Sequence, residues 1–116
     1  MLSVHYQDGS ILADAVEEAK TFAVRSKGLL GRRNLLDNEG MLFRNCKSIH
    51  MFGMHIALDV IFLDKRNRVV KVYRKLKPWR MATGGPDAKH VIELAAGTLP
   101  ENRPALGEQL QISDPA

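Results

Sequence analysis

The chain has 116 residues, of which 45% are hydrophobic and 26% are charged, and its formal net charge is +4. This length suits one globular domain over residues 1–116 and leaves little room for a second. The single cysteine excludes an intramolecular disulfide, no apolar run approaches the roughly 20 residues of a membrane-spanning helix, and the N-terminus lacks the basic-then-apolar order of a signal peptide. We therefore expect a soluble cytoplasmic protein without membrane insertion.

The N-terminal part predicts a β-hairpin followed by the one helix of the chain. Residues 4–6 and 11–16 are β-prone, and the Asp8-Gly9 dipeptide between them is typical of a tight hairpin turn. The run from Glu17 to Lys27 repeats small and apolar residues at spacings of three and four. It begins with acidic residues and ends with basic ones, as the helix dipole favours. We therefore expect a helix there, with its apolar face packed on the sheet.

The central stretch from Asn45 to Asp64 gathers rare residues of the chain. It holds the only cysteine, Cys46, and two of the four histidines. Short apolar runs before and within it predict strands at 41–43 and 48–51. Gly53 predicts a bend. The run from Ile56 to Leu63 is apolar on both faces, which predicts a central strand.

The C-terminal half predicts further short strands. Residues 69–76 alternate as a strand, and Asn67 before them can take a positive φ, so a hairpin is expected. A loop at 78–88, a strand at 90–94, a loop at 99–107 and a strand at 110–112 follow. We therefore predict a mainly β (α+β) fold, a single-domain antiparallel β-sandwich or barrel of about six to eight short strands with one packed helix near the N-terminus.

Five blocks of sequence occur in a recognisable order. They are Phe22-x-x-Arg25-x-x-Gly28-Leu29-Leu30-Gly31-Arg32, Gly40-Met41-Leu42-Phe43, Cys46-x-x-x-His50-x-x-x-Met54, the run from Leu58 to Asp64, and Val91-Ile92-Glu93-Leu94-Ala95-Ala96-Gly97. In this order they resemble the family called domain of unknown function 192. Where many members carry aromatic-Trp-Met-Lys-Asn, this chain has His50 to His55, so it resembles a Cys/His-containing variant. The resemblance implies a compact, mainly β domain with one helix, and it implies no reaction.

Cys46, His50 and His55 are the candidate metal ligands. Thiolate and imidazole bind Zn²⁺, and Asp59 could add an oxygen ligand. The spacing is not that of a standard zinc motif, and on an extended strand His55 faces away from the other two unless Gly53 marks a bulge. The alternative is a buried thiol with two partly exposed imidazoles. No cofactor is predicted.

Cys46 could also be a nucleophile with His50 as its base. Arg44 and Lys47 beside it would favour the thiolate. No third orienting residue and no oxyanion hole can be assigned. The enzymatic alternative is therefore a metal- or cysteine-dependent hydrolase that uses Cys46, His50, His55 and Asp59.

Three other features each allow two interpretations. Asp59 stands at the entrance to an apolar strand, where a carboxylate needs a partner, so it is either a structural anchor or a polar group of a ligand pocket. Trp79 is either a lid over its own sheet or a partner contact. The basic residues from Lys65 to Arg80 form either a solvated strand face or a nucleic-acid surface, and nucleic acid is not expected.

These residues favour a non-enzymatic binding or accessory module. Its cleft would bind a small polar ligand or another protein. The residues expected to bound this cleft are His50, His55, Asp59, Trp79 and Arg32. Polar residues converge near one strand, but no catalytic set is complete, so enzymatic activity is left open.

Overall fold

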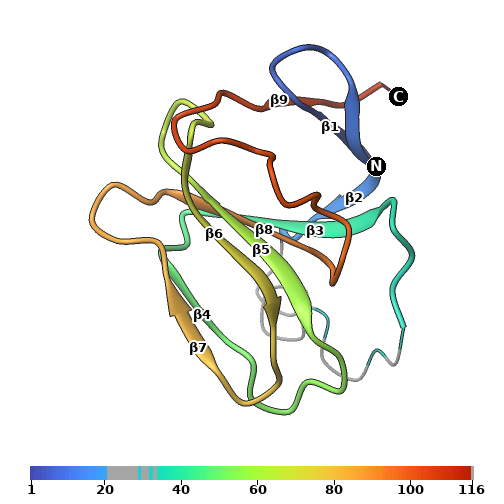
Figure 1. Cartoon of the computed structure of the whole chain (residues 1–116), viewed down its shortest axis with the longest axis vertical. Helices are drawn as coiled ribbons and strands as arrows, with labels where there is room; N and C mark the ends of the chain where they lie inside the picture. Colours follow the sequence, from blue (N-terminus) through green and yellow to red (C-terminus); the bar gives the residue numbers. More distant parts are fainter. Residues whose placement is uncertain (21–28, 30–31, 33, 116) are drawn as a thin grey trace.

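A computed structural model of the chain describes residues 1–20, 29, 32 and 34–115. These residues form nine β-strands and no helix (Figure 1). The strands are Leu2–His5 (β1), Ile11–Glu18 (β2), Glu39–Arg44 (β3), Ser48–His50 (β4), Leu58–Leu63 (β5), Val69–Leu76 (β6), Met81–Thr83 (β7), His90–Ala95 (β8) and Gln111–Ser113 (β9). No helix long and apolar enough to cross a membrane occurs in the described ranges.

Seven strands form one curled sheet in the order β6-β5-β8-β3-β2-β1-β9. Neighbouring strands are antiparallel except β2 and β3, which are parallel. The two edge strands approach each other at one end. There the N–H of Leu110 donates to the carbonyl oxygen of Asn67 at 2.9 Å, and Arg68 forms a β-bridge with Gln109. The sheet is therefore a half-barrel whose edges are joined at that end.

The two faces of the main sheet carry separate cores. Because side chains alternate between faces, β5 and β8, which are buried at every position, supply both cores. The first core draws on six strands of the main sheet, so the sheet curls around it. It contains Val4, Tyr6, Leu12, Ala13, Val16, Leu42, Ile61, Leu63, Val69, Ile92, Leu94, Leu99 and Leu110.

The second core lies on the opposite face, beneath the small sheet of β4 and β7. Its buried members are Ala19, Leu29, Met41, Phe43, Met51, Met54, Leu58, Val60, Phe62, Ala82, Ala88 and Val91. The small sheet and the turn after β4 supply Met51, Met54 and Ala82, so they cover this face. Figure 1 shows β4 and β7 side by side, away from the end of the molecule that holds β1, β9 and both termini.

Gly84 lets the segment after β7 approach the main sheet closely. A Cβ atom built on Gly84 would lie 2.6 Å from ring atoms of Phe62 and 2.5 Å from Cβ of Ala88. Carbon atoms do not pack at such distances, so a side chain here would push the segment away from β5. The glycine therefore holds the small sheet against the second core.

The mainly β class and both predicted hairpins are confirmed. β1 and β2 pair antiparallel around Asp8-Gly9, and β5 and β6 pair around Asn67, whose φ is 62°. The start of the predicted helix is wrong, because Glu17 and Glu18 are the last residues of β2 and pair with Met41 and Leu42 of β3. The rest of the predicted helix, residues 21–27, lies outside the described residues.

The predicted loop at 78–88 also needs correction. Met81–Thr83 form β7, which pairs antiparallel with β4. A three-residue strand in a Gly- and Pro-rich segment carries little signal of its own, since its partner strand determines it. With β7 the described strands number nine, and the architecture is a half-barrel with a small covering sheet.

Candidate functional site

Three aromatic side chains stack on the exposed side of the small sheet. The ring centroids of His50 and Phe52 are 4.9 Å apart with planes inclined at 29°, and those of Phe52 and Trp79 are 5.9 Å apart at 27°. We call these three residues the aromatic stack. Its two large rings are unusually exposed for apolar groups, at 43% for Phe52 and 68% for Trp79. Met81, which pairs with His50 across the small sheet, is 70% exposed.

The backbone of Met51 holds this surface together. Its carbonyl oxygen accepts the N–H of Trp79 at 2.8 Å, and its own N–H donates to the carbonyl oxygen of Arg80 at 2.7 Å. The Met51 side chain is fully buried in the second core. The aromatic stack therefore lies beside a hydrogen-bonded backbone whose Met51 side chain is anchored in the core.

Trp79 adopts a backbone conformation that bulky residues avoid. Its φ is 69°, in the left-handed region, where Cβ crowds the following carbonyl group. Such conformations persist only where the surrounding structure imposes them, and they concentrate at functional sites. The two hydrogen bonds to Met51 impose this one.

The residues that flank Trp79 in the sequence are positively charged. Lys75, Lys77 and Arg80 are exposed and flank Trp79 in sequence. No ion pair involving these three cations is found within the part of the chain that the structure describes.

Two of the residues predicted from the sequence, His50 and Trp79, meet in the aromatic stack through Phe52. His55 is exposed and does not belong to the stack. Arg32 forms an ion pair with Glu39 at 3.1 Å.

Asp59 is completely buried, and its carboxylate accepts three backbone N–H groups. They come from Lys75 at 2.9 Å, Gly97 at 3.1 Å and Leu99 at 2.9 Å. These bonds tie the end of β6 and the turn after β8 to β5. The geometry is that of a structural hydrogen-bond centre.

The Cys46 thiol donates to the carbonyl oxygen of Ser48 at 3.2 Å. Within the described ranges, no three His, Cys, Asp or Glu side chains are grouped closely enough to hold a metal ion. Cys46, His50 and His55 are among these described residues. A metal site built on these three residues therefore gains no geometric support, and the cysteine-dependent hydrolase stays a prediction.

Three residues of interest were not predicted from the sequence. Phe52 joins the two predicted aromatic residues, and Met81 extends their surface. The third is Glu93 of β8, whose side chain lies on the second-core face and is only 7% exposed. Burial raises the pKa of the Glu93 carboxyl to about 7. Its position inside the apolar run VIELA was the available signal, since a carboxylate in a buried strand requires an explanation.

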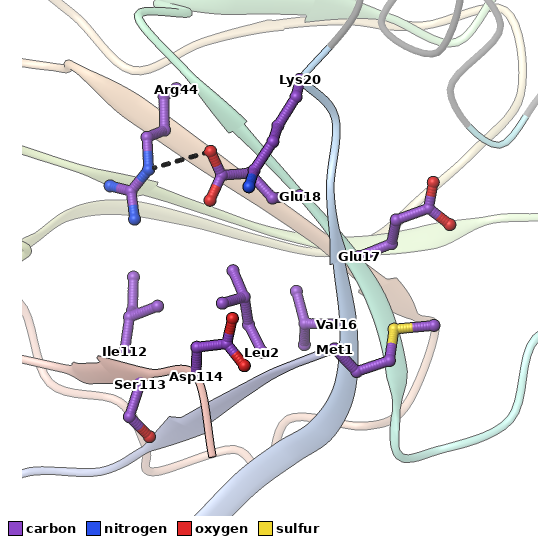
Figure 2. Close-up of a pocket in the computed structure, with 10 residues that line it drawn as sticks. All are labelled: Met1, Leu2, Val16, Glu17, Glu18, Lys20, Arg44, Ile112, Ser113 and Asp114. Carbon is purple, nitrogen blue, oxygen red and sulfur yellow. Dashed lines mark ion pairs between the residues drawn. The ribbon is translucent and has the colours of Figure 1, made fainter. Parts of the chain in front are cut away.

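A separate pocket of about 520 Å³ opens where β1, β2 and β9 meet β3 (Figure 2). Its floor is apolar and comes from Leu2, Val16 and Ile112. Glu18 and Arg44 face each other at its rim as an ion pair, with a distance of 3.5 Å between Arg44 Nε and Glu18 Oε2. This pocket includes none of the residues predicted from the sequence.

The family profile DUF192, described as "Uncharacterized ACR", matches residues 4–112. The chain belongs to this family. Among DUF192 relatives, a UPF0127 protein of Thermococcus sibiricus is 32% identical over 88% of this chain and 68% of its own length. A UPF0127 protein of Thermococcus gammatolerans is 36% identical over 78% of this chain and 61% of its own length. These DUF192 relatives are thus longer than the part they share with this chain.

Two solved structures share the fold. A protein of unknown function from Novosphingobium aromaticivorans has a TM-score of 0.79 and 25% identity, covering 95% of this chain and 82% of its own. A putative transcription regulator from Sinorhizobium meliloti has a TM-score of 0.79 and 23% identity, and the match covers 95% of this chain and 90% of that protein's chain. The DUF192 membership and these structures establish the family and the fold, and they name no reaction.

Proposed function

We propose that this DUF192 protein is a non-enzymatic protein-interaction module, and that the aromatic stack with Met81 is its contact surface. The observation that carries this proposal is the exposure of three large apolar side chains, Met81 on the small sheet and Phe52 and Trp79 in the segments next to its strands. Scattered exposed apolar residues need no explanation, but a grouped and positioned set marks an interaction surface.

The composition of the surface supports a protein partner. Tryptophan and other aromatic residues supply most of the binding energy at protein interfaces, particularly at the centre of the contact. The N–H of Trp79 donates to the carbonyl oxygen of Met51, and the carbonyl oxygen of the adjacent Arg80 accepts from the N–H of Met51. The backbone at Trp79 is thus already fixed, so little backbone entropy is lost when a partner binds.

The cations Lys75, Lys77 and Arg80 indicate the charge of the partner. They flank the apolar centre in sequence and would complement carboxylates at the rim of an interface. We therefore expect a partner segment that combines apolar side chains with Asp or Glu. The alternative hydrolase built on Cys46, His50, His55 and Asp59 stays a prediction, and the three N–H groups already bound to Asp59 give it no support.

A selection from a phage-displayed library of random peptides tests the proposal. The wild-type protein is the target, and a Phe52→Ala, Trp79→Ala variant removes peptides that do not need the aromatic stack. The selected peptides should carry apolar and acidic residues together. Because Trp79 is the only tryptophan, its fluorescence reports binding of a synthetic peptide at the site itself.

The single variant Phe52→Ala should bind the peptide roughly thirtyfold more weakly, the effect of losing about 2 kcal/mol at an interface hot spot. Leu106→Ala is the matched control, because Leu106 is 72% exposed and lies elsewhere. It should leave the affinity unchanged. Peptides that bind the double variant equally well would contradict the proposal. So would quenching of Trp79 by single-stranded oligothymidine with a steep salt dependence, which would indicate a nucleic-acid surface.

A further inference from the structure

The pocket that opens where β1, β2 and β9 meet β3 lies apart from the aromatic stack. The ten lining residues drawn in Figure 2 all lie within the described ranges. The pocket volume of about 520 Å³ is ordinary for small-molecule sites, which span about 300–1,000 Å³. Because β1 and β9 lie at the end of the molecule away from β4 and β7 (Figure 1), this pocket and the aromatic stack are separate surfaces.

The floor of the pocket is an open end of the first core. Leu2 and Ile112 are half-buried and pack against the buried first-core residues, and Val16 is one of those buried residues. The alternation of side chains places Glu18 on the same face of β2 as Val16, and Arg44 on the first-core face of β3. The apolar floor therefore continues into the core, and the two charged groups stand at its edge.

The polar rim of the pocket carries opposite charges side by side. Nε of Arg44 lies 3.5 Å from Oε2 of Glu18, and the two side chains are 39% and 22% exposed. Lys20, Glu17 and Asp114 also line the pocket, so both signs of charge recur around its rim. The separation of Arg44 and Glu18 is longer than the roughly 2.7–2.9 Å of a close charge-assisted hydrogen bond. A ligand that supplies well-placed charges of both signs can therefore compete for both groups.

An acid and a base this close together select against ligands that carry a single charge. A lone carboxylate that approaches Arg44 is repelled by Glu18, and a lone ammonium that approaches Glu18 is repelled by Arg44. A ligand with an ammonium and a carboxylate on one carbon atom meets each group with the opposite charge. The apolar floor adds a requirement for an apolar side chain on that carbon. Aliphatic α-amino acids combine these features.

We propose that this pocket binds an aliphatic α-amino acid as its zwitterion. The ligand carboxylate accepts hydrogen bonds from the Arg44 guanidinium, the ligand ammonium donates to the Glu18 carboxylate, and the ligand side chain packs on Leu2, Val16 and Ile112. None of these five residues belongs to the aromatic stack. This proposal and the protein-interaction proposal can therefore each fail without the other.

L-leucine is the probe, and nuclear magnetic resonance of ¹³C-methyl-labelled protein reports its binding at the pocket floor. The methyl signals of Leu2, Val16 and Ile112 should shift as L-leucine is added. Three analogues each remove one element of the ligand: N-acetyl-L-leucine lacks the ammonium, L-leucinamide lacks the carboxylate, and glycine lacks the apolar side chain. Each should bind roughly tenfold more weakly or worse, as expected for losing a hydrogen bond between charged groups or the burial of a leucine side chain.

Two variants test the roles assigned to the charged groups. Glu18→Gln should lose the preference for L-leucine over N-acetyl-L-leucine, because no acid at this position then repels the single carboxylate. Arg44→Gln should lose the preference for L-leucine over L-leucinamide for the corresponding reason. Asp8→Asn is the matched control, because it removes one partner of a different ion pair, with Arg103 at 3.3 Å. It should leave all four affinities unchanged.

Unchanged methyl signals of the pocket floor in millimolar L-leucine would overturn the proposal. Equal binding of L-leucine and glycine would also overturn it, as would wild-type preferences among the analogues that persist in both variants. The comparison of the four ligands on the wild-type protein needs no variant, so it decides the proposal even where a substitution destabilises the fold.

Discussion

Two buried carboxyl groups, one on each face of the main sheet, show how the two cores differ. Asp59 belongs to the first-core face and accepts three backbone N–H groups. Glu93 lies two residues before the end of β8, the strand that leads into the turn bonded by Asp59. Its side chain is on the second-core face, and within the described residues it accepts no backbone N–H group. The first carboxyl stabilises the fold. Burial of the second raises its pKa to about 7.

The same contrast holds for the apolar residues. The first core is closed by the curl of the sheet and by the segment before β9. Among the described residues, the second is covered by a two-stranded sheet, the turn after β4, and Ala19 and Leu29 from the segment after β2. The outer side of that small sheet carries the aromatic stack. We infer that one face of the main sheet maintains the fold while the other carries the features suited to recognition of a protein partner.

Removing the Asp59 carboxylate should have the largest effect on stability. Asp59→Ala leaves three N–H groups in or near the core without an acceptor, which should cost about 3–5 kcal/mol in the free energy of unfolding. Urea denaturation followed by circular dichroism measures this loss. Asp59→Asn, which keeps one acceptor oxygen, should lose less. A loss below about 1 kcal/mol for the alanine variant would mean that Asp59 is not the structural centre described here.

Glu93 should show the opposite behaviour, with a dependence on pH. Its pKa is about 7 in the folded protein against an ordinary value of 4.5. The protonated carboxyl therefore makes its full contribution to the free energy of unfolding below pH 4.5. This contribution is lost as the pH rises towards 7. Relative to Glu93→Gln, the wild-type protein should lose about 3 kcal/mol of unfolding free energy across this range, at about 1.4 kcal/mol for each unit of pKa.

Urea denaturation at a series of pH values, with both proteins measured together, tests this expectation. A difference between the two proteins that stays constant from about pH 4 to pH 8 would show that Glu93 is already paired with a cation. That result would remove the contrast with Asp59.

The smallest expected effect concerns Trp79. At φ 69° a glycine is favoured over any residue with a Cβ atom. Trp79→Gly should therefore be more stable than Trp79→Ala by about 1 kcal/mol, although glycine usually destabilises relative to alanine. Both variants should lose peptide binding. If Trp79→Ala were the more stable of the two, the backbone at this position would not be strained.

The sequence predicted those parts of the fold that depend on local chemistry. Asp8-Gly9 and Asn67 mark hairpins because their backbone preferences act within a few residues. It did not predict that β2 continues through Glu18, because that extension depends on parallel pairing with β3, about twenty residues further along the chain. Nor did it predict β7, whose three residues are a strand only because β4 lies beside them.

The candidate site divides in the same way. His50 and Trp79 could be singled out as rare residues in a turn-rich region. The stacking that joins them through Phe52 depends on the β4–β7 register, which no local pattern encodes. Glu93 stands in an apolar run as Asp59 does, but only Asp59 was singled out from the sequence. Only the positions of backbone N–H groups, which are a property of the fold, separate the two carboxyls.

The most direct test of the central proposal is a nuclear magnetic resonance titration of ¹⁵N-labelled protein with a peptide selected as described above. The account predicts that the amide signals that shift belong to β4, β7, the turn at 51–54 and residues 77–80, and that Trp79→Ala abolishes the shifts. Shifts confined to the pocket lined by Leu2, Val16 and Ile112, or unchanged in the Trp79→Ala variant, would contradict it.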